Sequence, residues 1–146
     1  MMPVGWVADS GQPYGGHAYN DALSAARLRG VPVVVPACHQ RWVDDEVTFT
    51  FLSPCGPLFT DGANDVNENS LVVLVHYGTV RALFMGDAGF QSEERLLHQG
   101  VDLHADILKV ASRLGLFFEC CVYRRCPSSD RDRFGRPPQP LRPPSA

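Results

Sequence analysis

The chain has 146 residues, 45% of them apolar and 20% charged, with a formal net charge of −3 at neutral pH. It is long enough for one domain with a hydrophobic core, and its charge argues against a general phosphate-binding surface. No apolar run reaches the roughly 18–20 residues of a membrane helix, and no signal peptide is evident, so we expect a soluble, cytoplasmic chain as written.

The first sixty residues predict three strands and one helix. Residues 4–9, 31–36 and 46–54 have the apolar character of strands, and the last of these alternates. Residues 17–30 predict a helix that ends at a glycine. The apolar residues at roughly helical spacing in this segment are Ala22, Leu23, Ala26 and Leu28.

The next fifty residues continue the alternation of strands and helices. Residues 61–70 form a polar loop, and residues 71–86 predict a hairpin of two strands around a Tyr-Gly-Thr turn. Residues 87–100 predict a helix, and residues 105–110 a buried strand. Strands with helices between them predict a layered α/β domain over residues 1–110.

The character of the chain changes after Val110. Residues 111–126 show no clean hydrophobic period, and residues 127–146 hold six of the twelve prolines. We predict that residues 111–146 form an aberrant and largely disordered tail.

Asp87 is the main candidate for chemistry. It comes after the apolar residues 82–85 and lies in the sequence Gly-Asp-Ala-Gly. A carboxylate at the end of a rigid strand is well placed to bind a metal. The alternative is that Asp87 caps the amides of the turn or of the following helix.

The other polar clusters give weaker signals. The loop "NDVNENS" contains Asp65 and Glu68 but lacks the order and the glycine of a calcium loop, so we expect a solvated turn. None of the five histidines has HxH or HxxxH spacing, as a zinc site would. The five cysteines are odd in number and form no repeated CxxC, so neither a disulfide framework nor a zinc knuckle is expected.

Three segments together resemble a known family. They read "VADSGQPYGGHAYNDALSAARLRGVPV", "GPLFTDGANDVNENSLVVLVHYGTVRALFMGDAG" and "EERLLHQGVDLHADILKV". In this order, over most of residues 4–110, they resemble the metallo-β-lactamase-like domain of ComEC-type DNA-uptake (competence) proteins.

The resemblance implies an αββα sandwich with a metal-dependent hydrolase site at strand ends, acting on DNA during uptake. Asp87 matches the aspartate of the family's Gly-Asp motif, which ligates or bridges divalent metals, zinc or manganese. Such metals turn water into a nucleophile and polarise a phosphoryl oxygen. Full-length relatives lie in the cell membrane.

The chain departs from the family pattern twice. The family's HxHxDH cluster precedes the first of the three segments and is absent here. The family's Gly-His-His-Gly-Ser is replaced after Val110 by Ala-Ser-Arg-Leu-Gly. Permitted codons for residues 111–126, read one base later, give His-His-Gly-Ser, so we interpret the tail as the product of a frameshift.

Three hypotheses follow from these observations. The chain is a fragment of the hydrolase domain without catalysis or stable metal binding of its own. Alternatively, it is a working hydrolase or nuclease whose substitute ligands, such as His17, His39 or Asp65, converge on Asp87, or whose missing histidines come from a second chain. The third hypothesis is a non-catalytic binding module. For a partial sandwich we expect exposed sheet edges and an exposed apolar face.

Overall fold

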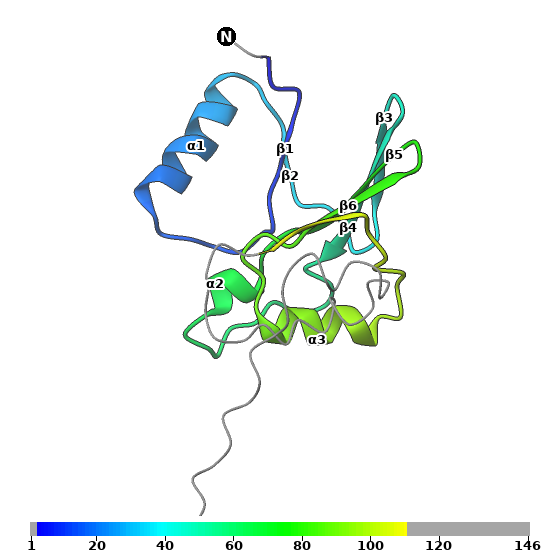
Figure 1. Ribbon diagram of the computed structural model, residues 1–146. Coiled ribbons are helices and arrows are strands. Elements are labelled where there is room, and N and C mark those ends of the chain that lie inside the picture. Colours follow the sequence, from blue (N-terminus) through cyan, green and yellow to red (C-terminus); the bar gives the residue numbers. More distant parts are fainter. Residues whose placement is uncertain (1–2, 111–146) are drawn as a thin grey trace, which may run out of the picture.

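The computed structural model describes residues 3–110, which form a mixed α/β fold of three helices and two sheets (Figure 1). The smaller sheet pairs β1 (Val7–Ala8) with β2 (Val33–Val34) in parallel. Helix α1 (His17–Leu28) connects these two strands. The α/β class predicted from the sequence is therefore confirmed.

The larger sheet has five strands in the order of the chain. They are β3 (Arg41–Asp44), β4 (Val47–Ser53), β5 (Val72–Tyr77), β6 (Val80–Phe84) and β7 (Ile107–Lys109). Neighbouring strands are antiparallel except β6 and β7, which are parallel. The predicted hairpin of residues 71–86 is β5 and β6, and it turns through Gly78 at a positive φ of 56°. The sequence did not predict β3, which pairs with β4 in a further hairpin.

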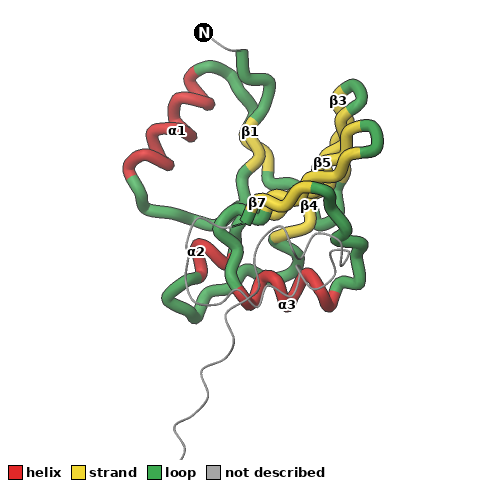
Figure 2. The backbone as a smooth tube through the Cα atoms, in the orientation of Figure 1, coloured by secondary structure: helices red, strands yellow, loops and turns green. Residues whose placement is uncertain are grey.

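One face of the larger sheet carries the hydrophobic core. Helix α3 (Phe90–His98) runs along this face, as Figure 2 shows, and its Leu96 is fully buried. Alternate residues of the central strands point toward it, because side chains in a strand alternate between faces. The buried core consists of Leu52, Val72, Leu74, Leu83, Met85, Ala88, Leu96, Leu103 and Ala105.

The opposite face of this sheet is apolar but only partly covered. The register places Phe49, Val75, Ala82 and Ile107 in one row across the sheet. Ile107 is 55% exposed, and Phe84 in the neighbouring row is 44% exposed. Near β3 the same face is better covered, because an aromatic cluster of Trp6, Trp42, Phe49 and Phe51 lies there. The exposed apolar face expected for a partial sandwich is thus present.

Helix α1 contributes no buried residue to the fold. Figure 1 shows it beside β1 and β2, on the other side of the large sheet from α3. Leu28, which was expected on its apolar face, is 88% exposed. The Tyr19 hydroxyl donates a hydrogen bond of 3.0 Å to Asp9, which follows β1. Desolvation of the Tyr19 hydroxyl is the larger cause, and the hydrogen bond to Asp9 the next, of a pKa of Tyr19 above its ordinary value.

The predicted tail, residues 111–146, lies outside the described residues. Its disorder and its origin in a frameshift therefore stay predictions. Among residues 3–110, no helix has both the length and the apolar character needed to span a membrane.

Candidate functional site

Asp87 lies in an exposed turn between the large sheet and α3. Strand β6 ends at Phe84, and the buried Met85 then extends its pairing, because its backbone N–H donates to the carbonyl of Lys109 at 3.1 Å. Gly86 follows with φ at 59°, a conformation that favours glycine. Strand β6 therefore places Asp87 on a glycine turn as expected, but the strand is only partly buried: Leu83 is buried, whereas Phe84 is 44% exposed.

Two side chains from neighbouring segments hold this turn. The backbone N–H of Asp87 donates to Ser70 Oγ at 3.1 Å, and Lys109 Nζ donates to the carbonyl of Gly86 at 3.0 Å. A Cβ on Gly86 would lie 2.9 Å from Ser70 Cβ, which is closer than packing allows. The turn is therefore fixed by contacts from both flanks.

Glu68 connects the polar loop to the start of α3. It ends the short helix α2 (Asp65–Glu68) and is buried, at 6% exposure. Its Oε2 accepts a hydrogen bond of 2.9 Å from the backbone N–H of Ser92 in the first turn of α3, and the Ser92 hydroxyl donates to the Glu68 carbonyl. A side-chain acceptor for the first turn of α3 thus comes from Glu68.

Asn69 is fully buried and joins three parts of the chain. Its Oδ1 accepts from the backbone N–H of Phe59 at 2.9 Å, and its Nδ2 donates to the Phe59 carbonyl at 2.8 Å. The same Nδ2 donates to Gln12 Oε1 at 2.5 Å. Asn69 thereby connects the loop before α2 and the loop after β1 to the end of α2, next to Ser70 and the Asp87 turn.

The expectation that "NDVNENS" is a solvated turn is wrong for Glu68 and Asn69, near its C-terminal end. Glu68 and Asn69 are buried because the backbone of Phe59, the side chain of Gln12 and the backbone of α3 offer them partners. Asp65 does behave as a turn residue, since both of its carboxylate oxygens accept from the N–H of Gly62. The loop supports the Asp87 turn, and nothing about it resembles a calcium site.

The described residues do not assemble metal ligands around Asp87. Between residues 3 and 110, the one group of three or more His, Cys, Asp or Glu close enough to share a metal is Cys38, His39 and Cys55, without Asp87. The substitute ligands His17 and Asp65 are not part of it either. A stable zinc or manganese site needs three or four protein ligands. The residues around Asp87 therefore do not fit the metal that the family resemblance implies.

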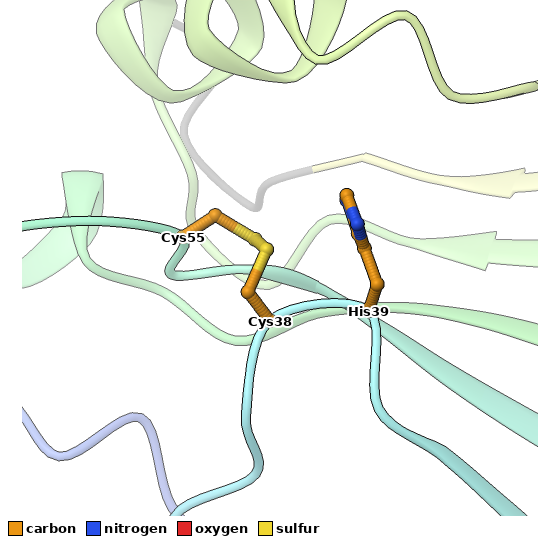
Figure 3. A group of neighbouring side chains, drawn as sticks. All are labelled: Cys38, His39 and Cys55. Atoms are coloured by element: carbon orange, nitrogen blue, oxygen red, sulfur yellow. A yellow bond between two sulfur atoms is a disulfide. The ribbon is translucent and has the colours of Figure 1, made fainter.

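Cys38 and Cys55 form a disulfide in the structure (Figure 3). Cys38 lies in the turn before β3, and Cys55 lies two residues after the end of β4 at Ser53. The disulfide therefore joins the two ends of the β3–β4 hairpin. This single disulfide was not expected from the odd number and the spacing of the cysteines. The pairing of β3 with β4 brings Cys38 and Cys55 together.

No family model, curated protein or solved structure matches the chain. The resemblance to ComEC-type proteins therefore rests on the sequence motifs and stays a prediction.

Proposed function

We propose that the chain carries part of the metallo-β-lactamase-like hydrolase domain of a ComEC-type DNA-uptake protein and has no catalytic activity by itself. The observation that carries this proposal is the clamped turn around Asp87. Ser70, from the motif "NDVNENS", binds the backbone of Asp87, from the motif "GDAG". Two of the motifs that carry the resemblance therefore support one carboxylate at the end of a strand, where such a hydrolase would need it.

The absence of catalysis is inferred from the count of ligands. Metal-assisted hydrolysis requires ions held firmly enough to activate water and polarise a phosphoryl oxygen. Around Asp87, residues 3–110 offer no second and third ligand in reach of a shared metal.

A second candidate function is supported by the exposed face of the large sheet. Phe84 and Ile107 lie on it, each more than two fifths exposed. A second polypeptide that covers this face would bury apolar surface and could bring the histidines that the site lacks. On this alternative the metal site forms between two chains; a non-catalytic binding module would use the same face without a metal.

Metal content of the purified, oxidised chain tests the lack of catalysis. We expect zinc and manganese at background in the parent and in Asp87→Ala. Asp44→Ala is the matched control, because Asp44 is also an exposed aspartate but ends β3. Near-stoichiometric metal that is lost only in Asp87→Ala would overturn this part of the proposal.

Complementation tests the family assignment. A separate polypeptide that carries the HxHxDH segment of a ComEC-type domain is mixed with the chain, together with zinc or manganese. We expect a complex that retains metal with the parent and loses it with Asp87→Ala. Failure to form a complex, or metal retention that ignores Asp87, would contradict the assignment.

A further inference from the structure

Cys38, His39 and Cys55 bring together chemistry that the proposed function does not use. One ligand atom of each lies within 4.8 Å of the others. Figure 3 shows the His39 ring standing beside the disulfide, on the same side of the turn. Two sulfurs and an imidazole nitrogen are ligands that zinc prefers in proteins.

The turn that carries Cys38 and His39 is held independently of the disulfide. The backbone N–H of Gln40 donates to the Ala37 carbonyl at 2.9 Å, and Gln40 Oε1 accepts from the Ala37 N–H at 2.8 Å. The same turn is bound to β4, because the His39 N–H donates to the Phe51 carbonyl at 2.8 Å and the Phe51 N–H donates to the Gln40 carbonyl at 3.0 Å. Reduction of the disulfide therefore leaves the turn in place.

The segment of Cys55 has its own anchor. Arg95 of α3 donates from Nη1 to the carbonyls of Cys55 and Pro57, at 3.2 and 2.7 Å. Cys55 is buried, whereas Cys38 is exposed and can rotate about its side-chain bonds. Two thiolates on a tetrahedral zinc lie about 3.8 Å apart, given Zn–S bonds of about 2.3 Å. Rotation of Cys38 can open this space without displacing Cys55.

His39 is held in an orientation suited to a ligand. Its φ is 60°, a left-handed conformation that non-glycine residues adopt rarely and that clusters at functional sites. Its Nε2 lies 2.9 Å from Gln99 Oε1. An amide oxygen only accepts, so Nε2 donates and Nδ1 of the neutral ring keeps its lone pair. Outer contacts of this kind orient the histidines that bind metals.

We propose that Cys38, Cys55 and His39 bind a zinc ion when the disulfide is reduced, so that disulfide and metal site replace each other. A dithiol reductant supplies two electrons and two protons, the S–S bond breaks into two thiols, and the reductant becomes a disulfide. Zinc then displaces one proton from each thiol and takes the His39 nitrogen as its third ligand. The fourth position holds water or an external ligand.

The test uses the full chain with Cys120, Cys121 and Cys126 replaced by serine, so that Cys38 and Cys55 are the remaining thiols. The reduced protein is titrated anaerobically with Co²⁺ and then with Zn²⁺. We expect one ion per chain, with thiolate-to-cobalt charge transfer and tetrahedral cobalt bands, and no binding by the oxidised protein. Absence of these bands in the reduced protein would overturn the proposal.

His39→Asn is the matched variant, because asparagine tolerates the positive φ and lacks the imidazole. We expect zinc affinity to fall by more than the roughly 10–100-fold that loss of an outer partner costs. Unchanged affinity would remove His39 from the site and overturn the proposal.

A further measurement needs no substitution at the site. Zinc should slow the reoxidation of Cys38 and Cys55 by oxidised glutathione, followed by counting free thiols over time. Equal rates with and without zinc would also contradict the proposal.

Discussion

Gly86 shows how a single residue fixes the position of the candidate ligand. Its φ is 59°, and a Cβ there would approach Ser70 Cβ to 2.9 Å and the Leu71 carbonyl to 3.2 Å. We predict that Gly86→Ala lowers the free energy of unfolding by at least about 2 kcal/mol, because the backbone cost of a positive φ and a steric clash add. Urea denaturation followed by circular dichroism measures the loss.

Gly100→Ala is the control for this prediction. Gly100 also has a positive φ, 67°, but a Cβ there meets no atom within 4 Å. Only the backbone cost of about 1–2 kcal/mol is expected. Equal losses in the two variants would mean that the contact with Ser70 does not constrain the Asp87 turn.

Glu68 makes a second contribution at the residue scale. Glu68→Ala removes the acceptor of the buried Ser92 N–H, and a buried donor without a partner costs about 1–3 kcal/mol. We expect Glu68→Gln to lose less, because its amide oxygen can still accept. Glu94→Ala, at an exposed position of the same helix α3, should change the free energy of unfolding by no more than about 0.5 kcal/mol. Comparable losses in Glu68→Ala and Glu94→Ala would refute this role of Glu68.

At the scale of elements, the sequence predicts what depends on local pattern. The alternation in β4, the glycine turn between β5 and β6, the helical spacing in α1 and the helix start and stop residues of α3 are all local signals. Strand β3 was missed, because Arg41 and Asp44 leave a run of only two apolar residues between them. The burial of Glu68 and Asn69 was also missed, since their partners lie 10 to 57 residues away in the chain. Only tertiary structure brings those partners together.

Helix α1 illustrates an element with a clear local signal and little tertiary support. It has 12 residues, none of them buried, and isolated helices of about this length are marginal in water. We predict that its backbone amides exchange with deuterium far faster than those of β5, which lies between two hydrogen-bonded neighbours. Hydrogen exchange with mass spectrometry compares both in one sample. Protection of α1 equal to that of β5 would show that another surface covers the helix.

At the scale of the whole molecule, the two faces of the large sheet differ in what covers them. One face packs against α3 and its buried Leu96. The other face leaves Phe84 and Ile107 partly exposed beside Val75 and Ala82. Contiguous apolar surface of this kind drives association or aggregation. The chain alone therefore leaves one apolar face of its sheet without full cover over the part that the structure describes.

Replacing the two exposed residues tests this asymmetry. We predict that the purified chain self-associates and binds an apolar fluorescent dye. The double variant Phe84→Thr, Ile107→Thr should reduce both self-association and dye binding, because it removes apolar area from the exposed face. Threonine is used because it favours strands. Sedimentation velocity and dye fluorescence measure the two effects. Val43→Thr is the matched control, because Val43 is 69% exposed and, by its pairing with Thr48, lies on the other side of the sheet from Phe49. Two outcomes would show that this face does not govern how the molecule associates. In one, the parent chain sediments as a single monomer and binds no dye. In the other, Val43→Thr reduces association as much as the double variant does.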